Sequence, residues 1–135
     1  PVLRWETRVV SVRELSRGAT VGYGRTYTAP ASMRAAVLPV GYADGYKFAL
    51  SNRGEVLIHG RRCPVLGRVS MDQIVVDVSR TAGVAPGDTA TLIGADGTEA
   101  VSVSELARLA GTIPYDILTG IGRRVARVYV GGEQE

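Results

Sequence analysis

Short β-forming runs separated by turn residues are the feature that most limits what this chain can fold into. Gly, Pro and Asp lie between several of them, and His59-Gly60 separates two runs in the manner of a two-residue hairpin turn. Closely spaced short strands favour a mainly β domain over a repeating βαβ sheet, either a small β-barrel with a Greek-key-like order or a sandwich. The runs occupy residues 6–12, 18–24, 33–40, 55–58, 61–66, 72–78, 89–93, 98–101 and 124–130.

Helix signals occur only late in the chain. Ser102 stands three residues before Glu105, which is typical of a capping box, and Gly111 is a natural stop for the helix that follows. Pro114 suits the first position of a second short helix that runs to about Thr119. We therefore expect one or two short helices near the C-terminus.

Composition excludes several classes of protein. The 135 residues are 45% hydrophobic and 21% charged, which fits one globular domain. A single cysteine, Cys63, excludes an internal disulfide, and with a single histidine, His59, the usual zinc sites lack ligands, so we expect no metal. No apolar run approaches the roughly 20 residues of a membrane span. The first residues do not resemble a signal peptide, and a leading proline indicates a piece of a longer chain.

The positive charge favours a solvated surface over a nucleic-acid interface. The net charge is +3, and every basic residue except Lys47 is an arginine. The arginines are scattered and often stand beside acids, whereas a nucleic-acid domain gathers them in one patch. A small barrel that binds RNA or single-stranded DNA by stacking bases on Tyr23 and Tyr27 remains an alternative, as does a pure protein-interaction domain.

Three segments carry more glycine, tyrosine and paired polar residues than plain strands need. In residues 21–30, glycines flank Tyr23, which leaves its ring open to a ligand or to packing at a barrel rim. Residues 39–46 form either a loop that presents functional groups or an ordinary turn. In residues 64–73, Arg68 and Asp72 share a face of an extended chain, as a surface ion pair or as an anion-binding arginine oriented by a carboxylate.

Taken in order, these segments resemble the C-terminal domain of alanine racemase. The family's tyrosine motif reads here as Gly22-Tyr23-Gly24-Arg25-Thr26-Tyr27, and its Gly-Tyr-Ala-Asp-Gly loop stands at residues 41–45. Its Gly-Arg-x-x-Met-Asp-Gln motif stands at residues 67–73, and its terminal strand reads Arg124-Val125-Ala126-Arg127. The resemblance extends from about residue 6 to residue 129.

The resemblance implies a two-domain, cytoplasmic isomerase that supplies D-alanine for peptidoglycan. An N-terminal (β/α) barrel, absent from this chain, holds pyridoxal phosphate on a lysine, and this chain corresponds to the mostly β domain that follows. Family members are head-to-tail homodimers, in which each active site combines one subunit's barrel with the partner's C-terminal domain. The expected partners are thus both barrel domains and a small amino-acid substrate, with no nucleic acid and no membrane. We expect this chain alone to bind no cofactor and to be inactive.

Matching positions imply roles for individual residues. Tyr23 matches the tyrosine that exchanges a proton with the substrate. The backbone N–H of Met71 matches a group that holds the substrate carboxylate, and Asp72 matches an acid at the mouth of the site. Supporting or substrate-channel positions are expected at Tyr42, Asp44, Arg68, Ile121 and Arg123.

Two departures leave the substrate range open. Lys47-Phe48 follow Tyr46 where some members carry an arginine, and Arg123 stands where some carry a gating tyrosine. A broad-specificity racemase acting on amino acids such as serine is therefore an alternative to a strict alanine racemase.

Overall fold

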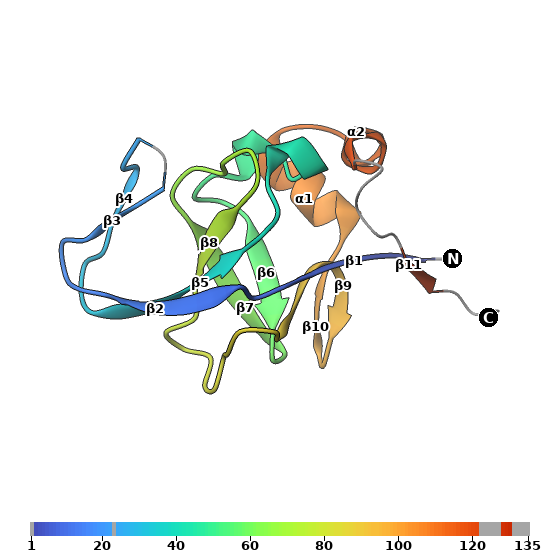
Figure 1. Cartoon of the computed structure of the whole chain (residues 1–135). Coiled ribbons are helices and arrows are strands. Elements are labelled where there is room, and N and C mark those ends of the chain that lie inside the picture. The colour runs from blue at the N-terminus through green and yellow to red at the C-terminus, as the bar shows by residue number, and fades with distance from the viewer. Residues whose placement is uncertain (1, 23, 122–127, 131–135) are drawn as a thin grey trace.

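The computed structural model describes residues 2–22, 24–121 and 128–130 and shows a mainly β molecule (Figure 1). Two α-helices, α1 (Val103–Ala110) and α2 (Pro114–Gly120), and two 3-10 helices, η1 (Tyr42–Asp44) and η2 (Phe48–Leu50), accompany the strands. The described strands are β1 (Val2–Arg8), β2 (Ser11–Leu15), β3 (Thr20–Val21), β4 (Tyr27–Thr28), β5 (Met33–Leu38), β6 (Glu55–Ile58), β7 (Arg61–Leu66), β8 (Ile74–Asp77), β9 (Thr89–Asp96), β10 (Glu99–Val101) and β11 (Val128–Val130).

All described strand pairs are antiparallel. The main sheet has the order β11-β1-β9-β6-β7-β8-β5-β2, with β10 paired to β9, while β3 and β4 form a separate ribbon. The mainly β prediction with short helices near the C-terminus is confirmed. Among the described strands no pairing joins β11 to β2, so the closed barrel remains a prediction. The predicted strand over residues 124–130 is described only at β11, because residues 124–127 lie outside the described part.

The single strand predicted over residues 6–12 is wrong, because the chain changes partners in its middle. The N–H of Val9 donates to the Asp88 carbonyl (2.9 Å), at the start of β9, and the N–H of Val10 donates to the Val37 carbonyl (2.9 Å) on β5. Val9 is buried and Val10 is 56% exposed. Strands β1 and β2 are therefore distinct, and they lie near opposite ends of the sheet order.

The β6–β7 hairpin is confirmed with its predicted boundaries. Its turn residues His59 and Gly60 both have positive φ, 53° and 75°, as a type I′ turn requires. The His59 ring is held by Nε2, 2.8 Å from Asp88 Oδ2, and by Nδ1, 3.1 Å from the Ala82 carbonyl. The lone histidine therefore stabilises a turn.

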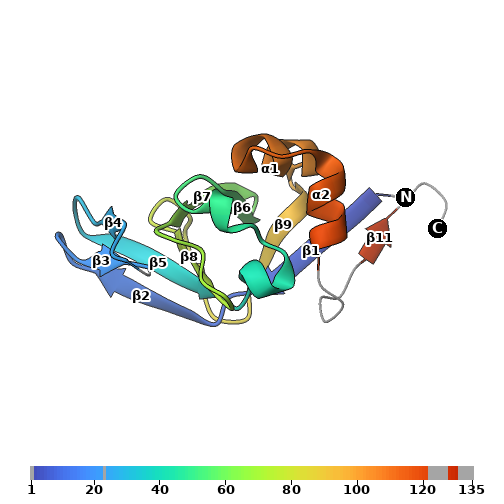
Figure 2. The ribbon, with the colours of Figure 1, turned by 90° about the horizontal axis from the view of Figure 1, so that it is seen from above.

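Both helix predictions are confirmed. The Ser102 hydroxyl accepts a hydrogen bond from the Glu105 N–H (3.0 Å), and Gly111 ends α1 with φ of 72°. Pro114 opens α2. Figure 2 shows the two helices side by side at one end of the molecule. No helix in the described ranges is long and apolar enough to cross a bilayer.

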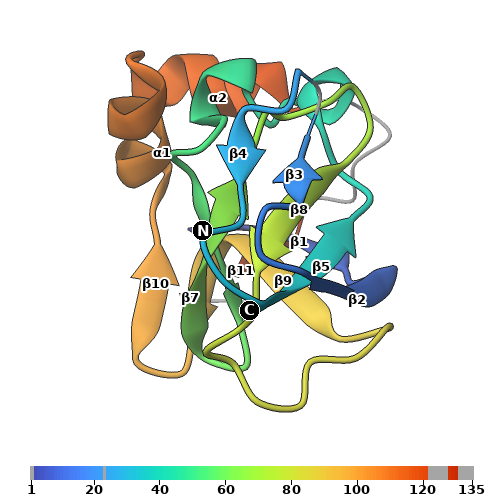
Figure 3. The same cartoon turned by 90° about the vertical axis from the view of Figure 1, so that its left-hand side faces the viewer.

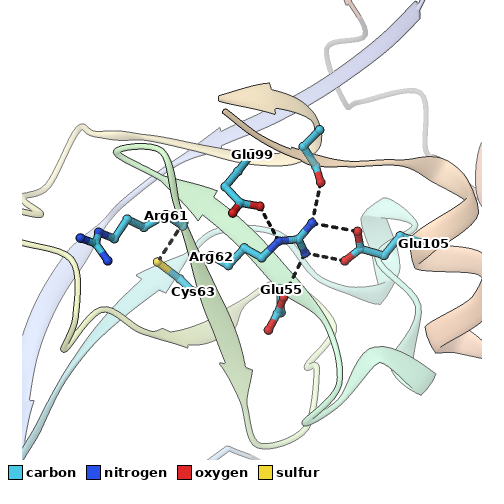
Figure 4. Close-up of polar contacts among 7 residues, drawn as sticks. Glu55, Arg61, Arg62, Cys63, Glu99 and Glu105 are labelled. Atoms are coloured by element: carbon cyan, nitrogen blue, oxygen red, sulfur yellow. Dashed lines mark hydrogen bonds and ion pairs between the residues drawn. The ribbon is translucent and has the colours of Figure 1, made fainter. Parts of the chain in front are cut away.

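Arg62 links four elements through one guanidinium group (Figure 4). It donates to Glu55 of β6 (3.0 Å), Glu99 of β10 (2.8 Å) and Glu105 of α1 (2.7 Å), and also to the Ala100 carbonyl (2.6 Å). The hydrogen bonds that Arg62 donates, above all to Glu105, raise its pKa, so it stays charged. This network holds α1 against the sheet.

Two apolar clusters form the core. The larger lies between the sheet and α1, and within it the rings of Trp5 and Tyr46 make an edge contact with centroids 6.2 Å apart. The smaller contains Val21, Met33, Ala35 and Leu66. Figure 3 shows the β3–β4 ribbon standing in front of the sheet, and the smaller cluster joins Val21 of the ribbon to residues of β5 and β7. The ribbon is thus anchored by its own small core.

Candidate functional site

The loop of residues 41–45 is built around the buried carboxylate of Asp44. Its Oδ2 accepts a hydrogen bond from the Gly41 N–H (3.0 Å), which closes the 3-10 turn η1 on itself. Asp44 is only 7% exposed, whereas Tyr42 in the same turn is 51% exposed. Asp44 therefore shapes the loop, and Tyr42 is presented outside it.

Backbone contacts join this loop to the segment of residues 67–73. The N–H of Tyr42 donates to the Ser70 carbonyl (3.0 Å), and the N–H of Ala43 donates to the Met71 carbonyl (2.9 Å). A side chain at Gly41 cannot fit, because its Cβ would lie 2.6 Å from the Met71 carbonyl carbon. The sequence-predicted residues Tyr42 and Met71 are thus brought to neighbouring backbone positions, and both side chains are exposed.

The same bonds fix the direction of two further N–H groups. A planar trans peptide points its N–H opposite to its carbonyl. Because the Ser70 and Met71 carbonyls face the 41–45 loop, the N–H groups of Met71 and Asp72 point away from it. Neither N–H has a hydrogen-bond partner within the described residues. They are two adjacent donors available to an incoming group.

Gly22 and Gly24 lie against the other end of this segment. A Cβ on Gly22 would be 2.9 Å from the Arg68 backbone nitrogen, and one on Gly24 would be 2.7 Å from Arg68 Nη1. The residues on both sides of position 23 therefore touch Arg68. Tyr23 itself lies outside the described residues.

Arg68 and Asp72 do not form the arrangement that their spacing predicts. Residues 67–73 are irregular rather than extended, so the two side chains do not share a strand face. No ion pair joins them in the described part of the chain, and both are exposed. Neither the surface ion pair nor the carboxylate-oriented arginine is present.

The end of α2 completes this region. A Cβ on Gly45 would be 2.7 Å from Ile121 Cα, so the 41–45 loop packs directly on the residue that follows α2. Ile121 is buried, which places this predicted residue beside the loop but not on its surface. Arg123 lies outside the described residues.

Sequence reasoning missed two polar residues that hold the segment in place. Asn52 accepts from the Gly67 N–H (2.7 Å) and donates to Thr26 Oγ1 (3.3 Å), and Ser51 Oγ accepts from the Val69 N–H (2.8 Å). Asn52 has a positive φ of 57°, which asparagine tolerates better than most residues. The available sequence signal for Asn52 was that it is the only asparagine and stands next to Arg53-Gly54.

These features define a class of protein: a mainly β domain in which glycine-containing loops pack against the irregular segment of residues 67–73. The sequence profile of the family described as "Alanine racemase, C-terminal domain" matches residues 2–129. The chain belongs to this family.

Known relatives carry the same region within a longer chain. An alanine racemase of Symbiobacterium thermophilum is 53% identical over 133 residues, covering 98% of this chain and 35% of the relative. One of Halothermothrix orenii is 47% identical over 135 residues, covering 98% and 36%. The solved structure of the alanine racemase of Streptomyces coelicolor A3(2) matches with a TM-score of 0.89 and 39% identity, over 96% of this chain and 34% of that one. The chain spans about a third of each relative.

The described residues do not fit pyridoxal phosphate, the cofactor of the family. A Schiff base needs a lysine amine, and Lys47 is the only lysine. Its Nζ lies 3.4 Å from Asp116 Oδ2, which also accepts from Thr112 Oγ1 (3.0 Å). The amine also lies against Gly120, whose Cβ would be 2.8 Å from Nζ. Lys47 therefore ties the loop after Tyr46 to α2. No cluster of three potential metal ligands occurs in the described residues either.

Proposed function

We propose that this chain is the C-terminal domain, residues 1–135, of an alanine racemase that interconverts L- and D-alanine. The observation that carries the proposal is that Gly22, Gly24 and the loop of residues 41–45 all pack against residues 67–73, in a chain of this family. Pyridoxal phosphate belongs, in this proposal, to the preceding domain of the relatives, since Lys47 is engaged with Asp116.

Tyr23 is the proposed proton carrier. Racemisation removes a proton from one face of the α-carbon and returns one to the opposite face, which calls for a group on each face. A free tyrosine has a pKa of about 10, so a phenolate usable at neutral pH requires about 4 kcal/mol from the surrounding positive charge. Arg68, which touches both neighbours of Tyr23, is one source of that charge.

The backbone N–H of Met71 is the proposed ligand of the substrate carboxylate. It points away from the 41–45 loop and has no partner among the described residues. Because the donor is a peptide group, Met71→Leu should leave the KM for alanine within about twofold. Tyr42, exposed at the same place, and Asp72 border the approach to the site.

A chimaera tests the activity. This chain replaces the matching segment of the Symbiobacterium thermophilum relative, and conversion of L- to D-alanine is measured with L-serine as a second substrate. Equal rates on both substrates would favour the broad-specificity alternative. A folded chimaera without racemase activity contradicts the proposal.

Tyr23→Phe in that chimaera tests the assignment of the proton carrier. We expect racemisation to be lost equally in both directions, because the equilibrium between enantiomers fixes the ratio of the two efficiencies. In D₂O one enantiomer should still exchange its α-proton, since the group on its face is intact. Tyr115→Phe, an exposed tyrosine on α2, is the matched control and should leave the rate unchanged. Exchange retained for both enantiomers, or lost for both, contradicts the assignment.

The head-to-tail dimer is part of the proposal and has its own test. A Tyr23→Phe chimaera is mixed with a chimaera that lacks the cofactor lysine of the barrel. If the tyrosine acts on the partner's site, random mixed dimers restore about a quarter of the sites, although each variant alone is inactive. If it acts within its own subunit, mixing restores nothing.

A further inference from the structure

A hollow of about 320 Å³ lies beside the β3–β4 ribbon and takes in Arg68 of the candidate site. It is lined by residues of β2, β3 and β8 and of the segment that links β7 to β8. Figure 3 shows the ribbon standing in front of β8 and β5, with β2 at the edge. The walls come from elements far apart in sequence, so the hollow is a product of the fold.

Two arginines give this hollow its charge. Arg13 of β2 and Arg68 line it, both are exposed, and neither guanidinium group has a hydrogen bond or ion pair with any described residue. No aspartate or glutamate is among the lining residues. The positive charge is therefore uncompensated, and an anion would be attracted to it.

The rest of the lining is apolar with a few polar groups. Leu15 and Val75 are half-buried and Val21 is buried, and all three belong to or pack against the small core beneath the ribbon. The Gln73 and Thr20 side chains also line the hollow and have no hydrogen-bond partners among the described residues. A ligand here would meet branched aliphatic side chains and two arginine side chains.

We propose that this hollow binds a short branched carboxylate that lacks an α-ammonium group. A guanidinium group pairs with a carboxylate through two parallel hydrogen bonds, and Leu15 and Val75 offer contact to an aliphatic tail. An α-ammonium group would find no acidic partner here and would be repelled by Arg13 and Arg68. The ligand is therefore distinct from the amino-acid substrate, and the inference does not depend on the proposed function.

Three ligands with one carbon skeleton test the proposal on the ¹⁵N-labelled 135-residue chain. 3-Methylbutanoate should shift the amide signals of Val21 and Gln73 in a saturable way. 3-Methylbutanamide lacks the charge and L-valine adds the ammonium, and each should bind at least about fivefold more weakly. Equal binding of the amide means an apolar hollow only, and equal binding of valine means a general amino-acid site. Either result overturns the proposal, as does equal competition by inorganic phosphate.

Arginine variants locate the site. Arg13→Gln and Arg68→Gln should each weaken 3-methylbutanoate binding by about tenfold. Arg17→Gln is the matched control, because Arg17 is exposed and has no partner among the described residues but does not line the hollow. An equal loss in Arg17→Gln would show attraction by net charge alone and would overturn the proposal. Unchanged amide dispersion in the free variants verifies that they are folded.

Discussion

The hydroxyl of Tyr46 is buried without a hydrogen-bond partner among the described residues, and its contact with Gly54 gives a sharp test of the core. The side chain is fully buried, and a Cβ added to Gly54 would overlap the hydroxyl oxygen. The next nearest atoms are Tyr46 Cζ at 3.2 Å and Val65 Cγ2 at 3.3 Å, which need only a small adjustment. Gly54 is not among the positive-φ glycines, so alanine is compatible with its backbone.

A double-mutant cycle separates the contributions. Tyr46→Phe removes an unpaired buried hydroxyl and should raise the free energy of unfolding by about 1 kcal/mol. Gly54→Ala alone overpacks the core and should lower it by about 2–3 kcal/mol. In the Tyr46→Phe background the clash with the hydroxyl is gone. Alanine also reduces the backbone entropy of the unfolded chain, which offsets the strain of the remaining contact. Gly54→Ala should therefore lower the free energy of unfolding by less than about 1 kcal/mol in that background.

Urea unfolding of the four chains measures a coupling free energy of about 2 kcal/mol. Tyr115→Phe on the exposed face of α2 is the control and should change the free energy of unfolding by less than about 0.5 kcal/mol. If Gly54→Ala costs the same with and without the hydroxyl, the packing described here is refuted.

The pH dependence of the free energy of unfolding, compared between the unchanged chain and Tyr46→Phe, provides a second measurement. Burial raises the pKa of Tyr46, with Glu105 and Glu55 adding to the shift. The unfolded chain therefore ionises this tyrosine above pH 10 while the folded chain does not, and the free energy of unfolding falls by about 1.4 kcal/mol per pH unit from this group. In Tyr46→Phe this contribution to the fall in the free energy of unfolding between pH 10 and 11 should be absent. Parallel curves would contradict the burial of the hydroxyl.

Three further outcomes test other parts of the fold. Arg62→Lys keeps the charge but loses the planar fork that binds three glutamates, and should lower the free energy of urea unfolding by about 1–2 kcal/mol, with Arg62→Met costing more. Burial raises the pKa of the Cys63 thiol, so iodoacetamide at pH 8 should alkylate the folded chain at least about tenfold more slowly than the urea-unfolded chain, as read by mass spectrometry. Ser102→Ala removes the cap of α1 and should cost about 1 kcal/mol in the same unfolding assay, whereas equal stability would mean that the Glu105 N–H is satisfied by water.

Elements with local chemical signals were predicted correctly. The β6–β7 hairpin follows from a turn whose two residues adopt positive φ, and α1 follows from a side-chain cap and a terminal glycine. These signals act within four or five residues, so the sequence contains the whole cause. The break at Val9–Val10 has no such local cause, because it arises where the chain exchanges β9 for β5 as its partner.

The candidate site was predictable as a set of segments but not as a geometry. The motifs indicated which segments to compare, and the structure places Tyr42 beside the Met71 backbone. The irregular path of residues 67–73 depends on hydrogen bonds that its N–H groups donate to the side chains of Ser51 and Asn52. These two residues are distant enough in sequence to leave no periodic signal. For that reason the strand-face argument for Arg68 and Asp72 failed.

The loops of the candidate site meet through backbone atoms, and this determines which substitutions it tolerates. Residues 41–45 approach residues 70–71 and the end of α2 so closely that Gly41 and Gly45 cannot carry a Cβ. The side chains of Tyr42 and Met71 are exposed, and neither takes part in these backbone contacts, so both can change without moving them. Any group the site offers from the Met71 peptide is thus held in place by glycine packing. Replacing a glycine should damage the site more than replacing the exposed residue beside it.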